Sequence, residues 1–172
     1  MEVWLLRHAV AEDRAPSGRD ADRALTAEGR HRADAVARGL ASLDPEISAV
    51  WSSPYRRARE TAQPAARALG LEKTLRETRS LEPGRDPEAV VAELAAAGED
   101  SVLLVGHEPH LGELLGWLVS GGAGPAIPLK KASVARIEVD ADRRGALRAL
   151  LPARVLEALA GSKRKSSRSV RR

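Results

Sequence analysis

A short apolar run, Val3-Trp4-Leu5-Leu6, leads directly into Arg7 and His8. Such a run is typical of a strand that is buried on both faces of a parallel sheet. A second run, residues 101–105, is followed by Gly106 and His107. Because ligands bind at the carboxyl ends of the strands in open α/β sheets, we expect the two histidines to mark a functional site.

The rest of the chain alternates between strand and helix patterns. A weaker apolar run covers residues 47–51, and alternating apolar residues over 135–139 predict a strand nearer the sheet edge, paired with 147–151. The predicted helices begin at Thr26, at Ser53-Pro54 (N-cap and first helical residue), at Asp86-Pro87, near Leu111 and near Val155, and glycines 70, 98 and 121 end the second to fourth. This alternation predicts an α/β fold, a three-layer α/β/α sandwich around a mostly parallel central sheet.

Composition limits the class of protein. The 172 residues are 43% hydrophobic and 30% charged, a balance that suits one soluble domain. No apolar run approaches the roughly 20 residues that span a membrane, and the first residues lack the features of a signal peptide. Cysteine is absent, which excludes disulfides and thiolate metal sites, so we expect a cytoplasmic protein without a membrane partner.

The positive charge is concentrated at the end of the chain. Residues 161–172 contain six Lys and Arg residues and no acid; without them the net charge of +4 becomes −2. They include one large apolar residue, Val170, so we predict a domain over residues 1–160 and a basic disordered tail over 161–172. The tail is either simply solvated or an electrostatic contact for nucleic acid or an acidic partner.

Arginines accompany the histidines at the predicted sheet edge. The third apolar run continues into Ser52-Ser53 and a helix that carries Arg56, Arg57 and Arg59. If the three strands are parallel neighbours, these arginines and both histidines meet in one cationic pocket. Such a pocket suits a phosphoryl group, because arginine binds its oxygens bidentately.

Four segments resemble motifs of the histidine phosphatase superfamily, and in particular its small SixA-like branch. Leu5-Leu6-Arg7-His8-Ala9 is similar to the opening Arg-His-Gly motif, with Ala9 in the third place. The other three segments are Asp20–Thr26, Ser52–Ala62 and Val105–Pro109. The resemblance runs from about residue 3 to residue 151, and it implies the histidine phosphatase (phosphoglycerate mutase-like) fold.

The resemblance also implies roles. His8 would be the nucleophile that becomes phosphohistidine, and its neutral imidazole is available near pH 7. Arg7, Arg57 and His107 would line the phosphate pocket and stabilise charge on the phosphoryl oxygens. Arg23 looks like an additional phosphate ligand of the SixA-like branch. No cofactor or metal is implied, and the His107-x-x-His110 spacing is not expected to bind one.

The general acid is the least defined part of the prediction. The alignment places Ser80 where larger members of the superfamily carry an acid; Glu82 is the nearest candidate, and Asp20 and Asp22 are weaker ones. An imidazole leaving group, with a reference pKa near 6.5, needs less protonation than an alkoxide does. A weak or absent acid therefore favours phosphohistidine on a protein as substrate.

Three alternatives stay open from the sequence. The chain could act on a small phosphate ester or anhydride, it could bind phosphate without turnover, or it could contact nucleic acid through its tail. The slightly acidic body and the 2% aromatic content argue against nucleic acid binding elsewhere. His31, between Arg30 and Arg32, is expected to be exposed.

Overall fold

The structure is a computed structural model that describes residues 1–122, 124–142 and 144–166, the last five of these by their backbone only. Six strands form one sheet in the order β3-β2-β4-β1-β5-β6. The strands are β1 (Glu2–Arg7), β2 (Ala49–Ser52), β3 (Leu75–Glu77), β4 (Ser101–Gly106), β5 (Val134–Val139) and β6 (Gly145–Leu151). Strands β3, β2, β4 and β1 are parallel, whereas β5 and β6 run antiparallel to their neighbours.

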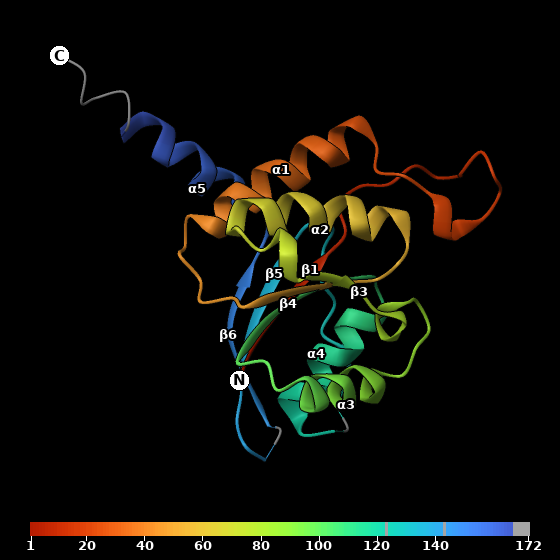
Figure 1. Cartoon of the computed structure of the whole chain (residues 1–172), viewed down its shortest axis with the longest axis vertical. Coiled ribbons are helices and arrows are strands. Elements are labelled where there is room, and N and C mark those ends of the chain that lie inside the picture. The colour runs from red at the N-terminus through yellow and green to blue at the C-terminus, as the bar shows by residue number, and fades with distance from the viewer. Residues whose placement is uncertain (123, 143, 167–172) are drawn as a thin grey trace.

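Helices cover both faces of this sheet (Figure 1). One face carries α1 (Ala27–Ala41), α2 (Arg56–Leu69) and α5 (Ala153–Ser166), and the other carries α3 (Pro87–Ala97) and α4 (His110–Ser120). Short 3-10 turns lie at η1 (Asp20–Asp22), η2 (Glu72–Thr74) and η3 (Arg79–Leu81). The predicted three-layer α/β/α sandwich with a mostly parallel sheet is confirmed.

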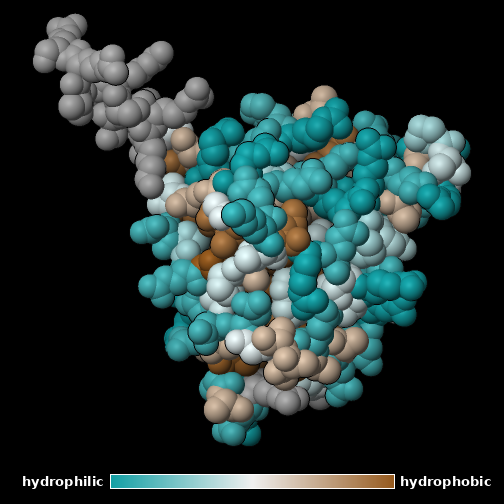
Figure 2. Space-filling model, in the orientation of Figure 1, coloured by the Kyte–Doolittle hydropathy of each residue, from teal (hydrophilic) through white to brown (hydrophobic). Residues whose placement is uncertain are grey.

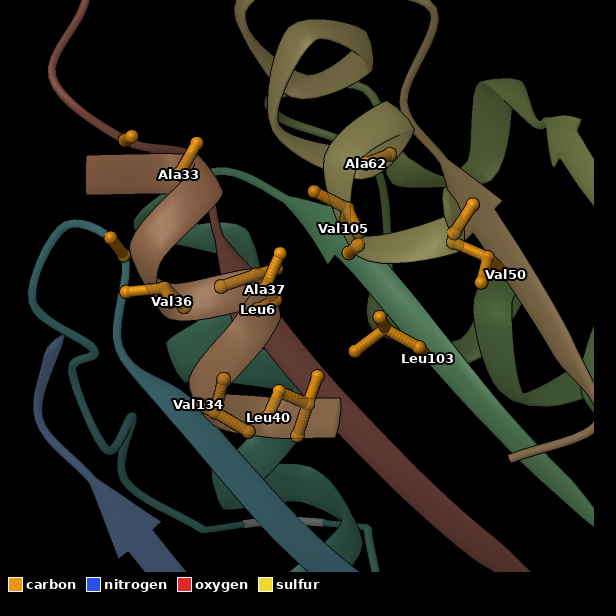
Figure 3. Close-up of a cluster of buried hydrophobic side chains, with 14 of the residues drawn as sticks. Leu6, Ala33, Val36, Ala37, Leu40, Val50, Ala62, Leu103, Val105 and Val134 are labelled. Carbon is orange, nitrogen blue, oxygen red and sulfur yellow. The ribbon is translucent and has the colours of Figure 1, made fainter. Parts of the chain in front are cut away.

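Alternation along the central strands builds two hydrophobic cores. Trp4 and Leu6 face α1 and α2, whereas Val3 and Leu5 face α3 and α4. Figure 3 shows the first core, in which Leu6 and Leu103 of the sheet lie among small side chains such as Ala37 and Ala62. Because the helices present alanine, they pack closely on the sheet and hold its carboxyl edge in a defined geometry.

Most of the predicted helix ends are confirmed. Thr26 accepts a hydrogen bond from the Gly29 amide, Asp86 accepts one from Glu88, and glycines 70, 98 and 121 follow their helices in the left-handed conformation. The start of α2 was predicted wrongly. Its N-cap is Tyr55, so Ser53 and Pro54 precede the helix, and the Ser53 hydroxyl is used elsewhere in the site.

Two further differences concern segments with weak patterns. The three-residue edge strand β3 was not predicted, because it follows the register of β2 rather than a pattern of its own. Helix α5 continues through the first six residues assigned to the tail, consistent with the favourable position of cations at a helix C-terminus. The remaining tail, residues 167–172, lies outside the described residues, so the boundary at residue 160 stays a prediction.

The outer surface gives no sign of a broad apolar face in the view of Figure 2, where hydrophilic residues predominate and apolar ones form small separate patches. Within the described residues, no helix combines the length and apolar character needed to cross a membrane.

Replacing Gly39 by alanine is expected to destabilise the fold. A Cβ at Gly39 would lie 2.0 Å from the backbone oxygen of Leu156, where α1 packs on α5. This clash should outweigh the gain of about 1 kcal/mol in helix propensity and cost about 1–3 kcal/mol net. Chemical denaturation would measure it. Gly161→Ala, whose Cβ meets nothing within 4 Å, is the control; equal stability of both variants would mean that the helices do not pack as described.

Candidate active site

The sheet topology brings the three predicted strand ends together. Strand β4 lies between β2 and β1, and all three are parallel. His8 and His107 therefore leave neighbouring strands at the same edge, with their ring centroids 5.1 Å apart. Ser53, which follows β2, completes the row. The expectation that both histidines meet at the carboxyl edge of the sheet is confirmed.

His8 is held as a neutral imidazole with a defined tautomer. Its side chain is largely buried, and Nδ1 lies 2.7 Å from the backbone oxygen of Ala9. Because a carbonyl oxygen only accepts hydrogen bonds, Nδ1 carries the proton and Nε2 keeps its lone pair. Burial, with the nearby charges of Arg57, Arg7 and Lys131, lowers the pKa of His8 to about 4, although the Ala9 bond acts in the opposite direction.

His8 is accordingly expected to stay neutral down to about pH 5, one unit above its pKa, whereas an ordinary histidine is mostly protonated there. Imidazole ¹H–¹⁵N correlation spectra would show the Nδ1–H tautomer between pH 8 and about pH 5. A His8→Gln variant assigns the signal. A titration midpoint of His8 near the ordinary value of 6.5 would contradict the burial of its ring.

His107 is fixed by the residue that was predicted to cap α2. Its Nε2 lies 2.8 Å from the Ser53 hydroxyl, and its ring meets the edge of Tyr55 with a centroid distance of 5.2 Å. Burial, followed by the neighbouring His8 and Arg57, lowers the pKa of His107 to about 2. Nδ1 is buried without a partner among the described residues.

Arg57 is the arginine of α2 that reaches the site. Its side chain is 6% exposed, and the guanidinium donates from Nη1 and Nη2 to the backbone oxygen and carboxylate of Asp20, at 2.8 and 2.9 Å. One turn later, the Thr61 hydroxyl donates to the Arg57 carbonyl and accepts from the Ala9 amide at 3.1 Å. Thr61 thus ties the loop after β1 to α2. Its position four residues after Arg57, on the same helix face, was the available sequence signal.

Arg7, the residue before His8, is held by the loop before β5. Its Nη1 donates to the backbone oxygen of Leu129 at 2.8 Å, and burial lowers its pKa despite the opposing charge of Glu108. The Glu108 carboxylate accepts from the Leu129 amide at 3.0 Å, and burial raises its pKa. Glu108 and Leu129, which sequence reasoning did not single out, together hold Arg7 in place.

Arg23 reaches the site only through Asp20. It donates to the Asp20 carboxylate at 2.8 Å and to the backbone oxygen of Glu12 at 2.6 Å. Burial alone would raise the pKa of Asp20, but the bonds from Arg23 and Arg57 outweigh it and keep the pKa below its ordinary value. Asp20 is therefore an ionised carboxylate that pairs with both Arg23 and Arg57.

An anion that binds Arg57 must share it with Asp20. Asp20→Asn keeps a side-chain acceptor but removes the charge, worth about 1 kcal/mol near solvent, so inorganic phosphate should bind roughly fivefold more tightly. Competition or calorimetry would measure the dissociation constant. Asp22→Asn, whose carboxylate pairs with Arg19 instead, is the matched control. Weaker phosphate binding to Asp20→Asn would instead make Asp20 a group that positions Arg57.

Glu82 lies in the environment of an ionised carboxylate. Its carboxylate pairs with Arg85 at 2.8 Å and Arg79 at 3.3 Å, and hydrogen bonding from Arg85 with the charge of Arg79 lowers its pKa despite some burial. Ser80 donates to Glu93 at 2.6 Å. Glu82 is thus ionised at neutral pH, and its role as an acid remains a prediction that this environment disfavours.

The remaining histidines differ in exposure. His31 is exposed, as expected, and His110, the first residue of α4, is fully buried. Over the described part of the chain, no cluster of three or more His, Asp or Glu side chains has the arrangement of a metal site.

Comparison with known proteins gives a consistent result. The sequence model described as "Histidine phosphatase superfamily (branch 1)" matches residues 3–80. An uncharacterized protein of Picosynechococcus is 36% identical over 147 residues, 83% of this chain and 88% of that protein. The phosphohistidine phosphatase SixA of Escherichia coli is 30% identical over 84% of this chain and 89% of its own length. A structure of the protein histidine phosphatase SixA complexed with tungstate, 28% identical, superposes with a TM-score of 0.81 over 91% of this chain and 99% of that one.

Proposed function

The chain belongs to the histidine phosphatase superfamily, as a phosphatase of its SixA-like branch, and we propose that it removes phosphate from phosphohistidine on a protein through a covalent intermediate on His8. The observation that carries this proposal is the state of His8: a buried, neutral ring whose Nδ1–H is committed to the Ala9 carbonyl, which leaves Nε2 as the nucleophile.

The proposed reaction has two displacements at phosphorus. The Nε2 lone pair of His8 forms a bond to phosphorus while the bond to the substrate nitrogen breaks. The departing ring keeps that electron pair and, with a proton on its other nitrogen, leaves as neutral imidazole. Water then attacks the phosphorus of phosphohistidine 8; its protons leave with inorganic phosphate, and the electron pair of the broken P–N bond returns to Nε2 and restores the neutral ring. Arg57 and Arg7 would neutralise the phosphoryl oxygens, and His107 would offer a further contact.

The surroundings of the carboxylates support a leaving group that needs little protonation. Asp20 and Glu82 both have pKa values held low by arginines. Burial raises the pKa of Glu108, although the Leu129 amide that donates to its carboxylate acts in the opposite direction. An alkyl phosphate would release a strongly basic alkoxide, whereas an imidazole can leave with much less assistance. This argument favours phosphohistidine over a small phosphate ester. The related SixA structure holds tungstate, an oxyanion like phosphate, which fits such a pocket.

The test compares two substrates under one set of conditions. The wild type is assayed with a phosphotransfer domain phosphorylated on histidine and, separately, with an alkyl phosphate such as glycerol phosphate. We expect kcat/KM to be at least about 100-fold higher for phosphohistidine, since the alkoxide requires an acid that typically contributes about 10²–10⁴-fold. A higher kcat/KM for the alkyl phosphate would refute the proposed substrate. The cytoplasmic location remains a prediction.

A further inference from the structure

The catalytic edge of the sheet continues beyond β1 onto β5 and β6. Val134, the first residue of β5, pairs with Leu6 on one side and with Leu151, the last residue of β6, on the other. The loop before β5 and the start of α5 therefore lie beside Arg7. Between them a groove with a volume of about 660 Å³ opens, and Arg7 is part of its wall.

The charged lining of this groove is almost entirely positive. Besides Arg7 it contains Arg32, Lys130, Lys131 and Arg154, against one carboxylate, that of Glu157. Arg32 neutralises Glu157 at 3.0 Å. Within the described residues, Lys130, Lys131 and Arg154 have no ion-pair partner, and all three are exposed. We refer to this surface as the basic groove.

The loop that carries the two lysines is fixed against the strand of the nucleophile. The Ala132 amide donates to the Arg7 carbonyl at 3.1 Å, and Ala132 is fully buried with a φ of 58°, a conformation that a β-carbon disfavours. Arg7, the residue before His8, lines the basic groove. A molecule bound in the groove would therefore lie beside the residue that precedes the nucleophile.

The apolar part of the groove indicates the kind of occupant. Pro128, Leu150 and Pro152 line it between the cations, and Leu150 is 46% exposed. A small anion is usually held by converging buried polar groups, whereas here the two lysines and Arg154 are exposed and share the groove with apolar side chains. Apolar contacts with a charged rim are the anatomy of a protein–protein interface.

We propose that the basic groove binds an acidic face of the phosphoprotein substrate and so presents the phosphorylated histidine to His8. This proposal rests on the proposed function and names the surface through which it acts on a protein. Complementary charges at an interface rim mainly speed association and select the partner, so the groove should matter for a protein substrate and not for the isolated phosphorylated amino acid.

The decisive variant is Lys130→Glu/Arg154→Glu, which reverses two groove charges and leaves Arg7 and Lys131 unchanged. Its control, Arg67→Glu/Lys73→Glu, makes the same charge change at exposed positions near the other end of α2. The substrates are an acidic phosphotransfer domain phosphorylated on histidine and free phosphohistidine, which contains the same bond. For the domain, the groove variant should lose about tenfold in kcat/KM through a higher KM. For free phosphohistidine, its kcat/KM should change by less than about twofold.

Salt provides a second readout. Raising the salt concentration from about 0.05 to about 0.3 M should lower kcat/KM for the domain more steeply in the wild type than in the groove variant. If the groove variant loses as much kcat/KM on free phosphohistidine as on the domain, or if the control variant loses as much as the groove variant, docking in the groove is overturned. If the wild type and the groove variant process the domain equally, docking is refuted while the proposed protein substrate stands. If the wild type cleaves free phosphohistidine but not the domain, the proposed protein substrate fails, and docking fails with it.

Discussion

His8→Ala is expected to lower kcat by at least about 10⁴-fold, the scale on which enzymes lose activity when a nucleophile is removed. His8 combines burial, a neutral ring and a tautomer set by the Ala9 carbonyl. Acid-labile phosphate should accumulate on the wild type during rapid-quench assays and be absent from the variant. His8 is packed at a strand end, so the variant's fold should be checked by circular dichroism.

The matched control is His31→Ala, which removes an exposed histidine from α1. It should keep wild-type turnover and wild-type trapping of phosphate. If acid-labile phosphate still accumulates on His8→Ala, then another residue forms the covalent intermediate, and His107 is the next to test. Loss of turnover together with retained phosphate binding is the result that supports His8 as the nucleophile.

Arg57→Lys should lower kcat/KM by about 10²–10³-fold, although it preserves the positive charge. The expected loss is similar to that from removing one donor at an oxyanion site. Arg57 donates from two nitrogens of a nearly buried guanidinium, and an ammonium cannot reproduce that planar, bidentate geometry. Steady-state kinetics on free phosphohistidine would measure the loss without any contribution from protein docking.

Arg56→Lys is the control on the same helix. Arg56 is exposed and pairs with Glu60 at 2.7 Å, so its replacement should change kcat/KM by less than about twofold, since exposed ion pairs contribute little. If Arg57→Lys, like Arg56→Lys, changes kcat/KM by less than about twofold, then a point charge suffices and the bidentate contact has no catalytic role. Large losses of similar size in both variants would instead point to disruption of α2.

The strand ends of the site were predictable from the sequence by itself. Short apolar runs identify the buried strands, and the residues that follow them, Arg7-His8 and Gly106-His107, must then lie at the carboxyl edge. Helix limits such as Thr26, Asp86 and Gly98 were predictable for the same reason. These features depend on contacts between residues a few positions apart, and such contacts are encoded in local order.

What only the tertiary structure decided involves partners far apart in the chain. Asp20 meets Arg57 across 37 positions, and Arg7 meets Leu129 across 122. No local pattern predicts which carboxylate occupies an arginine, which carbonyl holds a ring, or that lysines before β5 lie beside α5. The local cap pattern predicts Ser53 as the helix cap, but in the folded chain its hydroxyl bonds to His107 as well as to the Tyr55 amide. The sequence thus determined the layers, the sheet edge and its histidines, whereas packing between distant segments determined the state of each side chain.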